Sequence, residues 1–279
     1  MKLAVHMSMF CRTWTDDIRP FFPKLKEMGF DGVEISLFGA DWSCLRSVFI
    51  EARNNGLDII CGTGISTETD VSSKDAAVRQ AGIQYLNSAV DLAAEYGAEF
   101  INGVLYAPWQ VFALDEPLEE RWKRSADSLH VVGEHAKKAG IGLNCEVLNR
   151  FETDFLNTLD EGSRFVHMIG LDNVKLLADT FHMNIEEKDI CQALTSNIRN
   201  IGCVHICENH RGVPGTGHLN WRETVSTLEK AGYDQYLDME TFVEAGTEVG
   251  TALGIRRSSG LPPLEEAANG AAYMKKIMH

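Results

Sequence analysis

Residues 118–148 read LEERWKRSADSLHVVGEHAKKAGIGLNCEVL, and this stretch decides the fold. It opens with a helical pattern, since apolar residues such as Trp122 and Ala126 recur every three or four positions and form one face. Gly140 then stands where the helix must end in a left-handed turn. Residues 142–148 follow as a short β-rich run. A helix that leads into a strand is the repeating unit of folds built on a parallel sheet.

The same unit recurs along the whole chain. We expect eight strands, at 3–9, 32–37, 57–62, 99–105, 142–148, 174–180, 202–207 and 236–242. Six glycines each follow a helical pattern and precede a strand: Gly29, Gly56, Gly97, Gly140, Gly170 and Gly232. Eight such units in 279 residues, without a Pro- or Ser-rich linker, predict one (β/α)8 TIM barrel that spans residues 1–279 as a single domain.

Two further features refine this fold class. No GxGxxG motif follows the first strand, which argues against an open dinucleotide-binding sheet. Residues 260–263, Gly-Leu-Pro-Pro, interrupt the last helical stretch. We therefore expect residues 264–278 to form an extra C-terminal helix outside the barrel.

Charge and cysteine content limit the partners and the compartment. The chain has 26 Lys and Arg against 40 Asp and Glu, a formal net charge of −14. Phosphates demand concentrated positive charge, so we expect neither a nucleic-acid nor a membrane partner. The seven cysteines are an odd number without a CxxC motif, which indicates reduced thiols and a cytoplasmic protein. No run approaches the roughly 18 apolar residues of a membrane-spanning helix, and no signal peptide is evident.

Catalytic groups of a barrel come from the carboxyl ends of its strands and the loops after them. Four consecutive predicted strands end in Glu146, Asp179, His205 and Glu240. Three carboxylates and one imidazole suit a divalent ion such as Mn²⁺, Co²⁺ or Mg²⁺. A lone polar residue at a strand end is more often simply hydrogen-bonded. Burying three carboxylates together, however, requires a cation or protonated acids.

Three neighbours of these residues have open roles. Cys203 and Cys207 alternate with His205 on the same face of the strand and are either thiolate ligands or, as we favour, small apolar core residues. Asp238 lies two residues before Glu240 and is a candidate hydrogen-bond acceptor that orients His205.

Three longer blocks carry a family resemblance. Residues 146–152 (EVLNRFE), 179–187 (DTFHMNIEE) and 205–215 (HICENHRGVPG) are similar to the signature blocks of ketose 3-epimerases, the D-tagatose and D-allulose (psicose) 3-epimerases. The resemblance implies a Mn²⁺ or Co²⁺ site and a homodimer or homotetramer. The metal ligands that it implies are Glu146, Asp179, His205 and Glu240, and the substrate-binding residues are Glu152, His182 and Arg211.

The chain departs from this family where the far end of the sugar is expected. Residues 6–10 read HMSMF in place of a Gly-Phe-Tyr-like segment, and residues 107–109 read APW in place of an Ala-Trp-Pro-like one. Trp14 and Trp109 can still supply stacking surfaces for the sugar. These changes leave the particular ketose open.

Inversion of a carbon next to a ketone needs proton removal on one face and proton delivery on the other. Glu146 and Glu240 are the candidates for base and acid, with an enediolate between the two steps and an ion that polarises the carbonyl. An aldose–ketose isomerase on the same barrel is the first alternative. A metal-dependent DNA-repair endonuclease is disfavoured by the acidic charge, and a catalytically silent sugar-binding protein by the intact glutamate pair.

The loops after the last two strands indicate a free ketose rather than a sugar phosphate. A phosphate is normally bound by Arg or Lys side chains or by exposed helix amides in these loops. Here the first loop offers only Arg211, and the second carries Glu244 and Glu248. The competing possibility is an amide nest at residues 215–217, Gly-Thr-Gly.

Overall fold

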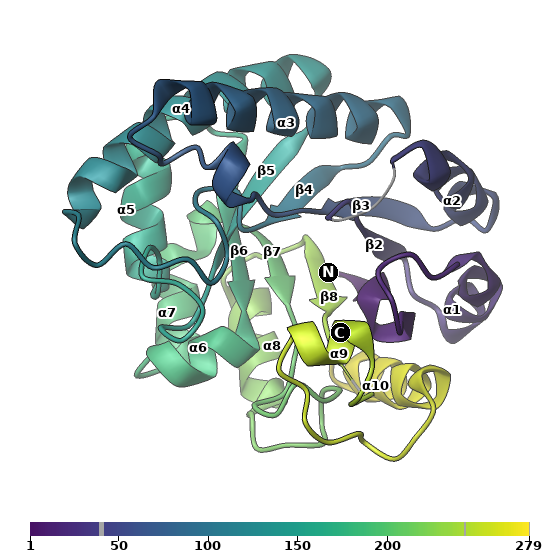
Figure 1. Ribbon diagram of the computed structural model, residues 1–279. Helices are drawn as coiled ribbons and strands as arrows, with labels where there is room; N and C mark the ends of the chain where they lie inside the picture. The colour runs from purple at the N-terminus through teal and green to yellow at the C-terminus, as the bar shows by residue number, and fades with distance from the viewer. Residues whose placement is uncertain (39–41, 243, 279) are drawn as a thin grey trace.

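The computed structural model describes residues 1–38, 42–242 and 244–278. Eight parallel strands form a closed barrel in chain order, and β1 closes the ring by pairing with β8 (Figure 1). The strands are β1 (Lys2–His6), β2 (Gly32–Ser36), β3 (Asp58–Gly62), β4 (Phe100–Gly103), β5 (Gly142–Val147), β6 (Val174–Asp179), β7 (Ile201–His205) and β8 (Tyr236–Met239). The predicted TIM barrel is therefore confirmed.

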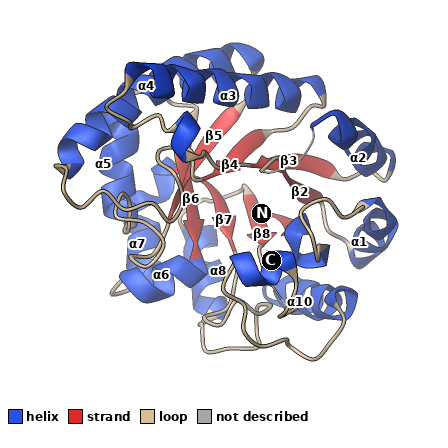
Figure 2. Ribbon diagram, viewed as in Figure 1, coloured by secondary structure: helices blue, strands red, loops and turns tan. Residues whose placement is uncertain are grey.

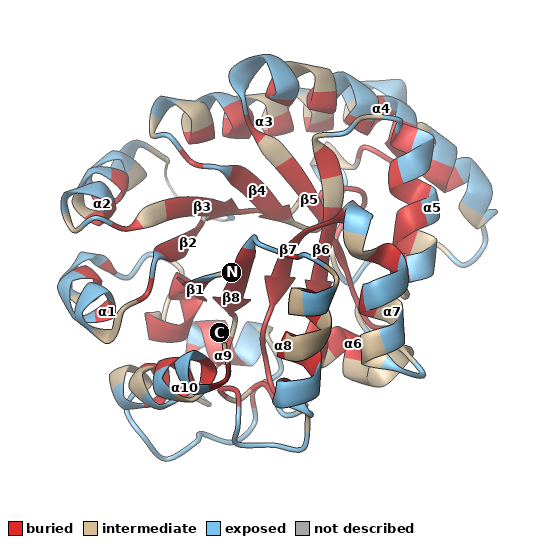
Figure 3. Ribbon diagram, turned by 180° about the vertical axis from the view of Figure 1, so that it is seen from behind, coloured by how far each residue is buried: buried red, intermediate tan, exposed pale blue. Residues whose placement is uncertain are grey.

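Helices surround the strands on the outside (Figure 2). They are α1 (Phe22–Met28), α2 (Trp42–Asn54), α3 (Ala76–Glu95), α4 (Leu118–Ala139), α5 (Leu159–Ile169), α6 (Thr180–Glu186), α7 (Ile190–Asn197), α8 (Trp221–Lys230), α9 (Glu248–Ala252) and α10 (Pro263–Ile277). The buried residues of these helices lie toward the sheet and the exposed ones face outward, as their apolar periodicity requires (Figure 3).

The helix ends and the extra helix also agree with the predictions. Helix α4 stops at Gly140, whose φ of 77° is left-handed, and the other five predicted glycines have positive φ as well. Helix α10 packs against α1 and α8, outside the barrel. Among the described helices, none is both long enough and apolar enough to cross a membrane.

Most predicted strands continue past the observed ends, because the chain turns at once into the loops of the barrel mouth. After β1 the chain forms a 3-10 helix, Met7–Phe10, in which the His6 side chain accepts a hydrogen bond from the Ser8 amide. After β6 the Asp179 carboxylate caps α6 through the Phe181 amide at 2.7 Å. Asp179 and His205 are thus the last residues of their strands.

None of the seven cysteines forms a disulfide bond. Cys203 packs inside the barrel in an apolar cluster that includes Ala4, Ile60 and Leu177. Burial raises the pKa of the Cys203 and Cys207 thiols well above the ordinary value, so both stay protonated. This favours the core role over the thiolate-ligand role that the sequence left open.

Candidate metal centre and active site

The four predicted ligands meet at the carboxyl end of the barrel. Glu146 lies near the end of β5, Asp179 and His205 end β6 and β7, and Glu240 directly follows β8. Each offers one ligand atom, and these four atoms all lie within 4.8 Å of one another. All four residues are buried or nearly so. Such a set of oxygens and one nitrogen fits a divalent cation.

One buried nitrogen of this cluster has no hydrogen-bond partner among the described residues. It is Nδ1 of His205, which lies 3.6 Å from Oε2 of Glu240. A buried nitrogen without a partner costs free energy unless something binds it. A cation among the four ligands would satisfy this nitrogen and offset the clustered carboxylates, so the residues fit such an ion.

In the metal-free protein, the pKa values of the two glutamates are shifted in opposite directions. Burial, together with the nearby charge of Glu240, raises the pKa of Glu146 well above its ordinary value. Burial acts on Glu240 too, but the charges of His205 and Arg211 outweigh it and hold its pKa well below the ordinary value. One carboxyl is therefore a proton carrier and the other is ionised, which is the arrangement that acid and base roles require.

The other two candidate ligands are also shifted. Burial raises the pKa of Asp179 to about 7, although Arg211 opposes this effect. Burial lowers the affinity of His205 for its proton, but Glu34 and Glu240 more than reverse this and raise its pKa well above the usual value. A metal that binds here must displace protons.

Asn149 positions His182 beside the metal ligands. The backbone N–H of Asn149 donates to Nδ1 of His182 at 3.1 Å, and Nη2 of Arg211 lies 3.3 Å from Nε2. Nε2 lies 3.7 Å from both Glu146 and Asp179. Burial, aided by the charge of Arg211, lowers the pKa of His182, which keeps the ring neutral.

Glu152 and Trp109 form a second rigid pair beside this histidine. The indole N–H of Trp109 donates to Oε2 of Glu152 at 2.9 Å, and the Asn149 side-chain amide donates to Oε1 at 2.9 Å. Arg211 lies 3.8 Å from Oε1. Trp109, Glu152 and His182 are thus held as one unit that faces the cavity.

Arg211 is the cation of the site. Its Nη1 lies 2.9 Å from Oε2 of Glu240 and 3.3 Å from Oδ2 of Asp179. The guanidinium lies 3.9 Å from the ring centre of Phe181 and 5.5 Å from that of Phe242. Its φ is 65°, a strained value for a residue with a side chain. Strain of this kind, held in place by packing, is typical of functional sites.

One cavity at the barrel mouth unites the predicted residues. Eight of them line it: Trp14, Trp109, Glu146, Glu152, His182, His205, Arg211 and Glu240. Asp179 does not line the cavity, because it is fully buried, and reaches the site through its contact with Arg211. Trp14 stands apart from the charged cluster and packs against the apolar cluster of Phe242, Val249 and Ile255.

The sequence analysis missed Glu34, the acceptor that faces His205. Nε2 of His205 lies 3.1 Å from Oε2 of Glu34, and Asn102 donates to the same oxygen at 2.5 Å. The prediction that Asp238 orients His205 is wrong, because neither oxygen of Asp238 has a hydrogen-bond partner in the described part of the chain. The sequence signal for Glu34 was a single charge inside the apolar strand Gly32–Ser36.

A barrel with a candidate metal cluster at its mouth is typical of metal-assisted barrel enzymes. Comparison with known families agrees with this class. The model of the xylose isomerase-like TIM barrel family matches residues 22–277. The chain belongs to this family, within the group of ketose 3-epimerases, and is therefore an isomerase.

Individual relatives cover most or all of the chain. D-psicose 3-epimerase of Agrobacterium fabrum is 31% identical over 100% of this chain and 99% of its own. L-ribulose 3-epimerase of Mesorhizobium japonicum is 37% identical over 78% of this chain and 73% of its own. A crystal structure of a D-psicose 3-epimerase in the presence of D-fructose superimposes with a TM-score of 0.92, at 31% identity, over 100% of this chain and 99% of that one.

Proposed function

We propose that this protein catalyses the reversible epimerisation of a free ketose at C3, with a divalent cation bound by Glu146, Asp179, His205 and Glu240. One observation carries the proposal: Glu146 and Glu240 come from separate strands, converge on one cluster, and differ strongly in proton affinity. The relatives named D-psicose and L-ribulose 3-epimerase support the same reaction.

In one direction, one of the two glutamates removes the proton from C3 and the other delivers a proton to the opposite face. The roles exchange in the reverse direction, so no redox cofactor is needed. A divalent cation would polarise the carbonyl and offset the charge of the enediolate, which is worth several kcal/mol of barrier. Because Glu146 and His205 are buried, little water can reach the carbanion between the two steps.

The other polar residues orient the sugar. Arg211 is fixed between Phe181 and Phe242, so its free donors can bind the oxygens of the reacting end. His182 and Glu152 both line the cavity, where the imidazole and the carboxylate can form hydrogen bonds with the hydroxyls next to C3. Trp14 and Trp109 offer apolar surfaces to the sugar.

The cavity supports an unphosphorylated substrate. Arg211 is the only Lys or Arg among the described residues that line it. The amide of Gly215 donates to buried Glu208 at 2.9 Å, and the amide of Thr216 lies 3.3 Å from the carbonyl of Val213. Because these amides already have hydrogen-bond partners, the alternative of a phosphate-binding amide nest at residues 215–217 is disfavoured.

The proposal also covers the identity of the metal, the oligomeric state and the cellular compartment. The oxygen-rich ligand set favours Mn²⁺ or Co²⁺, with Mg²⁺ as a further option. We further propose a homodimer or homotetramer that works in the cytoplasm, where seven free thiols stay reduced.

The test is product analysis in deuterated water. Protein loaded with Mn²⁺ is incubated with D-fructose, D-psicose, D-tagatose and L-ribulose, and with the 6-phosphates of the hexuloses. We expect C3 epimers of the free sugars, with deuterium at C3. Deuterium confined to C1, with an aldose as product, would replace the proposal by an aldose–ketose isomerase. A clear preference for the phosphates would contradict the free-ketose assignment.

A further inference from the structure

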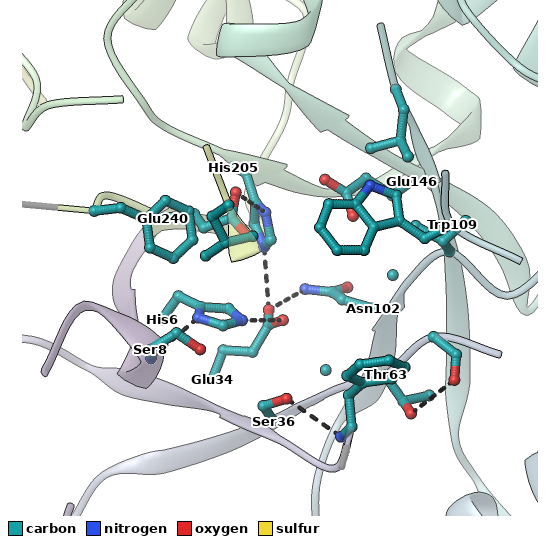
Figure 4. Close-up of a pocket in the computed structure, with 18 of the residues that line it drawn as sticks. His6, Ser8, Glu34, Ser36, Thr63, Asn102, Trp109, Glu146, His205 and Glu240 are labelled. Atoms are coloured by element: carbon teal, nitrogen blue, oxygen red, sulfur yellow. Dashed lines mark hydrogen bonds and ion pairs between the residues drawn. The ribbon is translucent and has the colours of Figure 1, made fainter. Parts of the chain in front are cut away.

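A chain of buried polar side chains crosses the barrel interior beneath the candidate metal ligands. Asn144 on β5 donates to Oδ1 of Asn102 on β4 at 2.9 Å. Asn102 donates to Oε2 of Glu34 on β2 at 2.5 Å, and Nε2 of His205 on β7 lies 3.1 Å from the same oxygen. Figure 4 shows the Glu34 carboxylate between these partners. Each of the four side chains is buried.

Space for this chain is left by two glycines. A Cβ atom at Gly62 would lie 2.4 Å from Oε1 of Glu34, and one at Gly202 would lie 2.0 Å from Oδ1 of Asn144. Both distances are far below van der Waals contact, so a side chain at either position would displace its polar neighbour. The interior of the barrel therefore accommodates the polar chain at the expense of apolar packing.

The partners of Glu34 determine which nitrogen of His205 carries a proton. A carboxylate only accepts hydrogen bonds, so Nε2 of His205 must donate to it. The opposite nitrogen, Nδ1, faces Glu240 and has no hydrogen-bond partner among the described residues. A neutral ring with its proton on Nε2 therefore directs the Nδ1 lone pair at the candidate metal cluster.

A second histidine helps to hold the carboxylate. Nδ1 of His6 accepts a hydrogen bond from the Ser8 amide, so the proton of a neutral His6 ring is on Nε2. That nitrogen lies 3.4 Å from Oε1 of Glu34. Glu34 is thus contacted from three strands besides its own, which leaves it little rotational freedom.

We propose that Glu34, held by Asn102 and His6, is a positioning residue that fixes His205 with its proton on Nε2 and Nδ1 toward the divalent cation. This inference rests on the metal site of the proposed function and not on the identity of the sugar. Carboxylates that orient a metal-binding imidazole typically affect metal affinity about 10- to 100-fold.

The experiment compares Mn²⁺ binding in the wild type and in Glu34→Gln, by electron paramagnetic resonance of free Mn²⁺. We expect the dissociation constant to rise about 10- to 100-fold in the variant. The ¹⁵N shifts of His205 in the metal-free protein, at a pH high enough to make the ring neutral, report the tautomer directly, because a bound cation would itself fix the tautomer. They should show one tautomer in the wild type and a mixture in Glu34→Gln, because an amide can either accept or donate.

Asp238→Asn is the matched control. It also replaces a buried carboxyl near His205 by an amide, but at a side chain without a hydrogen bond to that ring. We expect its Mn²⁺ affinity to stay within about threefold of the wild type and its His205 tautomer to be unchanged. An equal loss in both variants would overturn the specific role of Glu34.

Two further outcomes separate this inference from the proposed function. If the wild type binds Mn²⁺ and Glu34→Gln binds it equally well with one tautomer, the positioning role is wrong and the metal site stands. If the wild type binds no Mn²⁺, the proposed function itself fails. If Glu34→Gln does not fold, Glu34→Asp tests the same point, since its shorter side chain withdraws the carboxylate from Nε2. Unchanged affinity in that variant would also overturn the role.

Discussion

The two ends of this barrel each gather three acidic or phenolic side chains around basic ones, with opposite results. At the amino end, Lys2 lies 2.9 Å from Asp58, 3.4 Å from Glu99 and 3.0 Å from the hydroxyl of Tyr236. The side chains of Lys2, Asp58 and Glu99 are more than 40% exposed. At the carboxyl end, three buried carboxylates share one histidine and one arginine.

The difference is one of solvation and pairing. Burial raises the pKa of Asp58, but hydrogen bonds from Tyr236 and Lys2 more than offset this and leave it below the ordinary value. At the carboxyl end, burial instead dominates at Glu146 and Asp179 and raises their pKa values. The charged groups of the amino end compensate one another, whereas a cation bound among the candidate ligands of the carboxyl end would lower its free energy. Barrels generally place stability at the former and chemistry at the latter.

Metal removal should separate the two ends most sharply. We expect dialysis against a chelator to abolish epimerase activity. A cation at 100 times its dissociation constant stabilises the folded state by about 2.7 kcal/mol. For a chain of this size, that corresponds to a Tm increase of about 5–10 °C. Calorimetry with and without Mn²⁺ measures it, and Asp179→Asn is the control, since it should lose the metal-dependent increase. Full activity in protein shown by elemental analysis to lack metal would contradict the proposal.

The same substitution at the two ends should next differ in its effect on kcat. Glu146→Gln and Glu240→Gln each remove a proton-transfer group and should lower kcat about 10²- to 10⁴-fold. Glu99→Gln, at the amino end, should leave kcat within about twofold, because Glu99 is half-exposed and far from the chemistry. Steady-state kinetics at saturating Mn²⁺ decide this. Retained kcat in either active-site variant would exclude that glutamate as acid or base.

The stabilisation by Mn²⁺ should also grow with pH. The folded-state pKa values of Asp179, about 7, and His205 are raised, so metal-free protein loses stability as pH rises through them. Mn²⁺ must displace the same protons, and its affinity should therefore increase at least about tenfold from pH 6 to pH 8. We expect the Tm increase with Mn²⁺ to be larger at pH 8. An equal Tm increase at both pH values would contradict the raised pKa values of Asp179 and His205.

These contrasts also explain what the sequence could predict. The barrel followed from helical periodicity and from glycines such as Gly140, because both act over a few residues. The candidate ligands were proposed from one rule, that strand ends meet at the barrel mouth. Glu34 escaped because its partners, Asn102 and His205, are distant in sequence and lie on strands that do not neighbour β2. Asp238 was chosen from strand parity, which gives the side of a residue but not its contacts.

The smallest expected effect is that of Tyr236→Phe at the amino end. The variant removes a hydroxyl that lies 2.7 Å from Asp58 and 2.9 Å from Glu99, while Lys2 still contacts both carboxylates. Because one hydrogen bond contributes about 1 kcal/mol, the free energy of unfolding should fall by about that amount. The Tm should fall by about 2–4 °C. Since the carboxyl end is untouched, kcat and Mn²⁺ affinity should both stay within about twofold. A tenfold change in either would show that the two ends are coupled.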